Sequence, residues 1–305
     1  MIEFLAASIR IATPILLAGL GGILSERAGV FAVGLEGMML IGAFGAAIGT
    51  AMSGGDALAG LAIALAGGAL AGLVVAIVAV RFRADNMVTG LSLNIVAVGL
   101  TSYLMRILSA SGQPMAIHNA LLPVMPIPLL SDLPWIGPLL FAHPPLTYLT
   151  IVLCVLFTLL LKRTEIGLTL RATGENPDVV FASGLNPLKV RMLAVIACGA
   201  VAGLGGAVLT TQQVGTFTDG MTSGRGYLAL AALIVGRWTP YGTAAACLVF
   251  AAAEALQYRL QGFGIPVSSY VMQMIPYLIG LAVLAGLGRN AHLPAAIGRP
   301  LDRRL

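Results

Sequence analysis

The chain has 305 residues, of which 58% are apolar and only 10% are charged. Ordinary soluble domains carry about 45–50% apolar and about 25% charged residues, so this composition excludes a soluble globular domain and a disordered chain. The net charge of +5 does not indicate a nucleic-acid partner, because the basic residues follow the expected membrane topology and form no soluble patch. The lipid bilayer is therefore the expected environment of the chain.

About nine apolar segments follow one another, and most approach the roughly 20 residues that a helix needs to cross a bilayer. They cover approximately residues 5–24, 30–52, 57–80, 86–110, 146–161, 190–211, 226–236, 240–260 and 268–288. We therefore expect an all-α fold, a polytopic transmembrane helical bundle with about 8–10 spans, in a single domain over residues 1–305. The segment at 226–236 is too short to cross alone, which predicts a re-entrant or broken helix.

The distribution of lysine and arginine predicts the orientation of the bundle. Most of the 17 basic residues fall on one side if residues 162–189 and the C-terminal tail are cytoplasmic, which places the N-terminus outside. Two long loops then lie on opposite sides. The external loop at about 111–145 is rich in proline and is expected to form a non-helical cap, and the cytoplasmic loop at about 162–189 is strongly polar.

A short internal similarity links the two halves of the chain. The sequence Ala-Gly-Leu-Gly-Gly occurs at 18–22 and again at 202–206, and an acidic-Gly-Met triplet follows each copy, at 36–38 and at 219–221. In the orientation above, the two copies run in opposite directions across the membrane. An inverted internal repeat, an architecture common among transporters, explains the similarity, and so does chance in a chain rich in glycine and alanine.

The cytoplasmic loop contains the signals of a short helix. Asn176 is suited to cap its start, Pro177 to occupy its first position, Asp178 to favour its positive end, and Gly184 to terminate it. This pattern predicts a helix that lies outside the membrane.

The face of that helix is expected to be apolar. Val179, Val180 and Phe181 are side chains that a solvated loop has little reason to display unless they contact another surface. A cytoplasmic partner and the protein's own bundle are both candidates for that surface.

Ionisable residues at membrane depth are costly and tend to face a pathway or a polar partner. Glu36 lies between glycines, where it can cap a half-helix or pair with Arg27, and Glu254 shares a helical face with Gln257 and Tyr258. Lining of a pathway and a structural hydrogen bond are open alternatives for both carboxylates.

The fourth apolar segment adds further polar side chains at helical spacing. Such groups can bind a polar solute or cross-link helices, and the sequence leaves both uses open. The candidates are Asn86, Thr89, Ser92 and Asn94. The cysteines and histidines are scattered without ligand spacing, so no catalytic residue, disulfide or metal site is expected.

Five stretches of the chain together resemble a known family. They are SERAGVF at 25–31, GLEGMMLIGAF at 34–44, GENP at 174–177, GRGY at 224–227 and ALAALIVGRWTP at 229–240. They resemble the permease subunits of bacterial ABC importers in the branched-chain amino acid and ribose permease superfamily. Within it they are similar to the nucleoside branch, the guanosine-type importers that depend on a basic-membrane protein.

The resemblance implies a multi-pass permease of the bacterial inner membrane that carries a small polar solute, with a nucleoside as the first expectation. It implies a second homologous permease or a second copy of this chain, a cytoplasmic ABC ATPase, and an extracytoplasmic solute-binding lipoprotein. No cofactor is expected on this chain, while ATP and Mg belong to the ATPase. The residues expected to contact the ATPase are Gly174, Glu175, Asn176, Pro177, Asp178, Val180, Phe181 and Gly184.

Other functions stay open at this point. Within ABC permeases, a simple sugar such as ribose or another purine-like solute can replace the nucleoside. A secondary transporter driven by an ion gradient would use membrane carboxylates such as Glu36 or Glu254, but it leaves the cytoplasmic loop without a purpose. An enzymatic activity is not expected.

Overall fold

The computed structural model describes residues 2–110, 121–126, 137, 139, 141–262, 271, 274–287 and 293–301. Within these ranges the chain is helical apart from turns, connections and two short antiparallel strands, β1 (Met125–Pro126) and β2 (Ala142–His143). The predicted all-α class is thereby confirmed. Most of the predicted external cap at 111–145 lies outside the described residues.

Each apolar segment predicted from the sequence corresponds to a helix. The first half contains α1 (Ile2–Arg27), α2 (Leu35–Met52), α3 (Ala57–Val75) continued by the π-helical turn η1 (Ala76–Arg81), and α4 (Asn86–Ala110). The connection contains α6 (Pro145–Arg163), α7 (Glu165–Glu175) and α8 (Pro177–Ala182). The second half contains α9 (Pro187–Val208) continued by η2 (Leu209–Val214), α10 (Arg225–Val235), α11 (Pro240–Gly262) and α13 (Ile275–Leu287).

Among the described residues, six helices are long and apolar enough to cross a membrane: α1, α2, α3 with η1, α4, α6, and α9 with η2. Helix α11 has 23 residues and, at about 1.5 Å per residue, also matches the thickness of a bilayer core, although it is less apolar. Helix α10 has only 11 residues and cannot cross alone.

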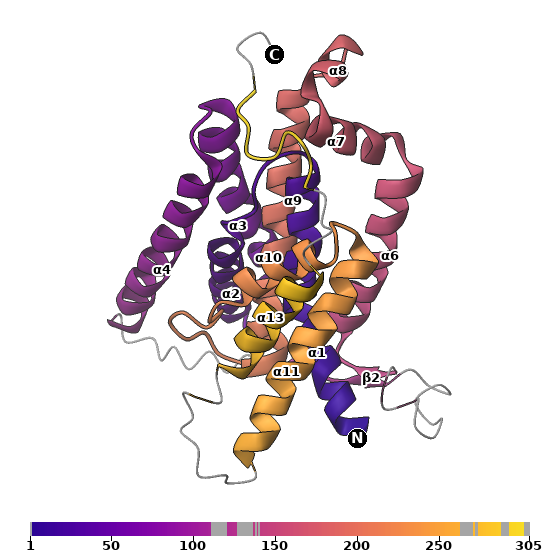
Figure 1. Cartoon of the computed structure of the whole chain (residues 1–305). Helices are drawn as coiled ribbons and strands as arrows, with labels where there is room; N and C mark the ends of the chain where they lie inside the picture. The colour runs from indigo at the N-terminus through magenta and orange to yellow at the C-terminus, as the bar shows by residue number, and fades with distance from the viewer. Residues whose placement is uncertain are drawn as a thin grey trace.

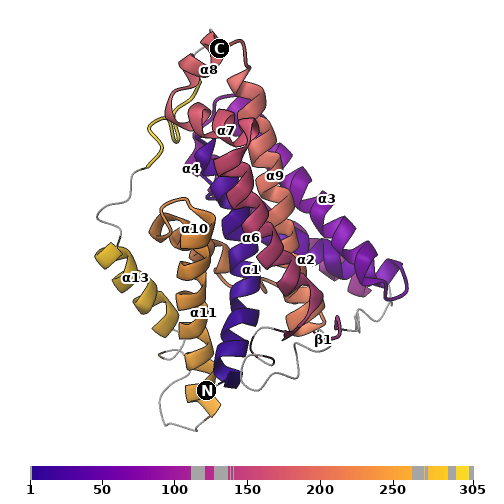
Figure 2. The same ribbon diagram turned by 90° about the vertical axis from the view of Figure 1, so that its right-hand side faces the viewer.

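Different segments of the chain lie at the two ends of the bundle. The N-terminus lies at one end, whereas α7, α8 and the C-terminal segment gather at the other, and α8 projects furthest from the bundle (Figures 1 and 2). This separation agrees with the orientation predicted from the basic residues, in which α7 and α8 are cytoplasmic and the N-terminus is external.

Helix α1 forms the centre of the bundle and packs along α9. Small residues permit this close approach, because a Cβ at Gly21 would lie 2.7 Å from the carbonyl oxygen of Cys198. A Cβ at Gly205 would lie 2.8 Å from the carbonyl oxygen of Pro14. Pro14 and Cys198 occupy equivalent positions relative to the two Ala-Gly-Leu-Gly-Gly sequences, so each copy supplies a glycine that packs on the other.

The helix contacts of the two halves also match. Helices α2 and α3 contact α9, just as α10 and α11 contact α1. Helix α4 then contacts α2, just as α13 contacts α10. This correspondence favours the inverted-repeat interpretation over chance, and it makes α2 and α10 the equivalent elements of the two halves.

Candidate functional site

Helix α10 begins inside the bundle because the preceding segment cannot be helical. Gly215, Gly220, Ser223 and Gly224 all adopt positive φ, and Gly224, the N-cap, supplies no side chain to cap the helix. The first N–H groups of any helix lack partners within the helix, and in a membrane no water is available to replace them. The start of α10 therefore requires an acceptor from elsewhere in the protein.

Glu36, in the first turn of α2, provides that acceptor. Its Oε1 accepts a hydrogen bond from the Gly224 N–H at 2.8 Å, and its Oε2 accepts one from the Gly226 N–H at 2.7 Å. The side chain is only 8% exposed, and a Cβ at Gly226 would overlap the Glu36 backbone. The sequence allowed Glu36 either to pair with Arg27 or to cap a half-helix, and the structure shows that it caps α10. Arg27 instead donates to the carbonyl oxygens of Arg237 and Trp238.

Asn94 on α4 also forms hydrogen bonds where the start of α2 meets the start of α10. Its Oδ1 accepts from the Gly37 N–H at 2.8 Å, while its Nδ2 donates to the Val33 carbonyl at 3.0 Å and to the Tyr227 hydroxyl at 2.9 Å. A cavity of about 430 Å³ lies beside this cluster. Its lining includes Glu36, Asn94, Ile95, Thr222 and Tyr227.

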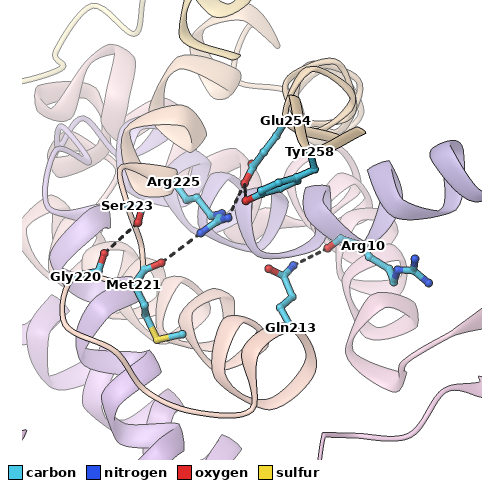
Figure 3. Close-up of polar contacts among 8 residues, drawn as sticks. All are labelled: Arg10, Gln213, Gly220, Met221, Ser223, Arg225, Glu254 and Tyr258. Atoms are coloured by element: carbon cyan, nitrogen blue, oxygen red, sulfur yellow. Dashed lines mark hydrogen bonds and ion pairs between the residues drawn. The ribbon is translucent and has the colours of Figure 1, made fainter. Parts of the chain in front are cut away.

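An ion pair lies on the other side of the α10 start (Figure 3). Arg225 Nη2 donates to Glu254 Oε1 at 2.5 Å, and Arg225 Nη1 donates to the Met221 carbonyl at 3.3 Å. The Tyr258 hydroxyl, from the same face of α11, donates to Glu254 Oε1 at 3.2 Å. Glu254 is only 8% exposed, so the pair neutralises a carboxylate that would otherwise be costly in the membrane.

A second cavity, of about 380 Å³, opens beside this ion pair between α10, α11 and α13. It is lined by Ser223, Arg225, Leu228, Glu254, Gln257, Tyr258, Gln261 and Pro276. The apolar segment expected at 226–236 left out Arg225, which the structure makes the first residue of α10. An isolated acid within an apolar helix needs a nearby cation, and that requirement could have pointed to Arg225.

The other polar residues of α4 do not join these clusters. The Thr89 hydroxyl donates to the carbonyl of Asp85, the residue just before α4, at 2.7 Å, and Asn86 is buried at the cytoplasmic end of α4. Ser92 is exposed, away from the buried side of α4 that contains Asn94. The expectation that Ser92 continues the helical face of Asn86 and Thr89 is therefore wrong.

The capped cytoplasmic helix is present as predicted. Asn176 Oδ1 accepts from the backbone N–H groups of Asp178 at 3.1 Å and Val179 at 3.4 Å, and Pro177 occupies the first position of α8. Gly184 adopts a φ of +82°, which ends the helix. The preceding helix α7 is capped in the same manner by Thr164.

The exposed face of α8 differs from the prediction at one residue. Val179 and Phe181 are 58% and 47% exposed, but Val180 is only 3% exposed. Neighbouring positions on an α-helix point about 100° apart, so the three side chains cannot share one face, and Val180 packs inward. Leu185, 47% exposed, extends the apolar surface, which we define as Val179, Phe181 and Leu185.

Gly174 lies beneath this surface and not on it. It is buried, and a Cβ there would overlap the carbonyl oxygen of Arg27 at the end of α1. Its own carbonyl accepts a hydrogen bond from the Ala296 N–H at 2.9 Å, and the Glu175 carboxylate accepts one from the Ala295 N–H at 3.2 Å. The C-terminal segment at 293–301 thus holds the end of α7.

Arg191, near the start of α9, anchors the same region. Arg191 is only 3% exposed, and its guanidinium donates to three carbonyl oxygens, those of Ala28 at 3.1 Å, Ala296 at 3.2 Å and Arg299 at 2.7 Å. The connection between α1 and α2 is thereby joined to the C-terminal segment. Sequence reasoning missed Arg191, because a basic residue in a cytoplasmic loop is normally exposed.

A short helix capped inside the bundle, flanked by cavities and joined to capped helices at one end, is typical of a membrane permease. The chain belongs to the family described as branched-chain amino acid transport system, permease component, which matches residues 4–284. It is therefore a multi-pass inner-membrane permease of an ABC importer, a class that works with an ATPase and a solute-binding protein.

Particular relatives are similar to nearly the whole chain. The guanosine ABC transporter permease protein NupQ of Bacillus subtilis is 34% identical, over 96% of this chain and 94% of the relative. The nucleoside ABC transporter permease protein NupC of Lactococcus lactis is 35% identical, over 94% and 92%. The putative glucose ABC transporter permease protein TsgC13 of Haloferax volcanii is 31% identical, over 92% and 90%. No solved structure matches the chain significantly.

Proposed function

We propose that this chain is a permease subunit of a nucleoside importer. The observation that carries the proposal is the similarity over nearly the whole chain to two permeases whose names state guanosine and nucleoside. In this proposal the chain pairs with a second homologous permease or a second copy of itself. A cytoplasmic ATPase supplies the energy from ATP and Mg, and an extracytoplasmic binding lipoprotein delivers the solute.

The ATPase contact in this proposal is the apolar surface of α8. Val179, Phe181 and Leu185 are exposed at the end of the molecule that projects furthest from the bundle (Figure 1). Exposed apolar side chains on a cytoplasmic helix with a well-formed cap favour a protein partner over solvent.

A physical connection runs from this surface to the membrane-depth junction. Gly174 packs on the end of α1, and the Gly298 N–H donates to the Gly29 carbonyl at 3.0 Å, so α7 and the C-terminal segment both contact the α1–α2 connection. That connection leads into Glu36, which holds the start of α10. Movement of α7 by the ATPase would thus reach the starts of α2 and α10, where this proposal places the passage of the polar solute.

The solute assignment is tested by uptake of labelled guanosine in cells with and without this gene. Excess unlabelled nucleosides, ribose, glucose and leucine serve as competitors. We expect gene-dependent uptake that nucleosides alone suppress. Suppression by glucose would instead agree with the relative named as a glucose permease and would contradict the nucleoside assignment.

The ATPase contact is tested by co-purification of the importer with Phe181→Asp. The charge would face an apolar partner surface, so we expect the ATPase to be lost while the permease is recovered in normal amount. Met52→Asp is the matched control, because Met52 is 81% exposed at the opposite end of the bundle. Retention of the ATPase by Phe181→Asp would contradict this assignment.

A further inference from the structure

The cavity beside the Arg225–Glu254 pair contains hydrogen-bonding groups that the protein does not use. Arg225 Nε is buried and has no hydrogen-bond partner among the described residues. Both hydrogen bonds that the structure shows at Glu254 go to Oε1, from Arg225 and Tyr258, which leaves Oε2 available as an acceptor. An unpaired buried donor is unfavourable, so the Arg225 guanidinium has hydrogen-bonding capacity that its protein partners do not fill.

The remaining polar groups of the lining are uncharged. Gln257 is 7% exposed and Gln261 lies one helical turn further along α11, and both amides can donate and accept hydrogen bonds. Tyr258 is 51% exposed and contributes an aromatic ring to the lining. The volume of about 380 Å³ falls within the range of about 300–1,000 Å³ typical of small-molecule sites.

The charges of the lining select against ions. Arg225 and Glu254 neutralise each other, so a cation meets the guanidinium and an anion meets the carboxylate, each at a cost. A neutral ring with adjacent hydroxyl groups suits both partners, because a hydroxyl can accept from the Arg225 guanidinium and donate to the Glu254 carboxylate. An adjoining planar ring can stack on Tyr258.

We propose that this cavity, lined by Arg225, Glu254, Gln257, Tyr258 and Gln261, binds the hydroxyl-bearing sugar of the transported solute. For a nucleoside, the ribose hydroxyls contact the polar groups and the base lies toward Tyr258. This inference rests on the proposed function for the identity of the solute. In this proposal the permease itself contributes to the selection of the solute. The cavity adjoins the start of α10, whose N–H groups donate to Glu36.

The test combines a change in the cavity with a change in the solute. The complete importer is reconstituted in proteoliposomes with saturating amounts of loaded binding protein, so that the affinity of that protein does not determine the rate. Guanosine and 2′,3′-dideoxyguanosine are transported by the wild type and by Gln257→Met, which keeps the side-chain volume and removes the amide. Gln213→Met is the matched control, because Gln213 donates to the Arg10 carbonyl at 3.0 Å outside the cavity (Figure 3).

We expect Gln257→Met to lower the rate for guanosine about 5- to 10-fold and to leave the rate for the dideoxy solute within about 2-fold. Gln213→Met should affect both solutes equally. An equal loss for both solutes in Gln257→Met, or no loss for either, would overturn the cavity proposal. If the wild type transports glucose and no nucleoside, the proposed function fails separately, and the same comparison with glucose and a deoxyglucose decides the cavity proposal.

Discussion

Replacing Glu36 tests whether the junction of α2 and α10 depends on its carboxylate. In Glu36→Leu the N–H groups of Gly224 and Gly226 both lose their acceptor, in a part of the protein where water does not replace it. Each unpaired buried N–H costs about 1–3 kcal/mol. The variant should therefore lower the free energy of unfolding by about 2–6 kcal/mol.

Glu36→Gln separates the two hydrogen bonds. The amide keeps one acceptor oxygen and replaces the other with a donor, so one N–H of α10 stays paired and the other does not. We expect a loss of about 1–3 kcal/mol, between the wild type and Glu36→Leu.

The assay is thermal and denaturant unfolding of the purified permease in detergent, combined with uptake. Glu165→Gln is the control, because Glu165 is exposed on α7 and its change should stay within about 0.5 kcal/mol. Equal stability of Glu36→Leu and the control, with normal uptake, would refute the capping role of Glu36.

Three other changes should have graded effects. Gly174→Ala places a methyl group against the Arg27 carbonyl and should cost about 1–3 kcal/mol and weaken ATPase binding, measured by unfolding and co-purification. Arg191→Met removes three hydrogen bonds from a buried guanidinium and should cost at least about 2 kcal/mol in the same unfolding assay. Burial lowers the pKa of His143 below its ordinary value of 6.5, the hydrogen bond to the Leu139 carbonyl opposes this decrease, and the nearby positive charge of Arg10 adds to it. The folded state thus favours neutral His143, so stability present above pH 6.5 should decline on acidification, and His143→Gln should flatten the dependence of the melting temperature on pH.

The first two of these predictions have matched controls. A Cβ at Gly99 meets no atom within 4 Å, so Gly99→Ala should be neutral or stabilising by up to about 1 kcal/mol. Arg163 is exposed at the end of α6, so Arg163→Met should change stability by less than about 0.5 kcal/mol. Equal losses in the paired variants, or the same pH dependence in His143→Gln as in the wild type, would contradict the assigned contacts.

Local signals in the sequence were sufficient for the helices. Apolar length located each membrane helix that the structure describes, and the sequence from Asn176 to Gly184 specified α8 because a cap, a first-position proline and a terminating glycine act within a few residues. The short segment at 226–236 predicted a broken helix for the same reason, since its length alone excludes a complete span.

Long-range pairs could not be assigned in this way. The sequence offered Arg27 and a half-helix as partners of Glu36, and only the packing of α2 against α10 decides between them. The Arg225–Glu254 pair likewise depends on how α10 and α11 meet. Val180 is buried although its neighbours are exposed. The rest of the fold decides which side of α8 is covered, and the six residues of the helix do not encode that side.

The most direct test of the account is transport by the purified importer in proteoliposomes. The permease, its partner permease, the ATPase and the loaded binding protein are assembled, and guanosine uptake is measured with ATP or with only an imposed proton or sodium gradient. The account predicts uptake that requires ATP and the binding protein and that persists when the gradients are abolished. Uptake driven by an ion gradient without ATP would contradict it and would identify a secondary transporter.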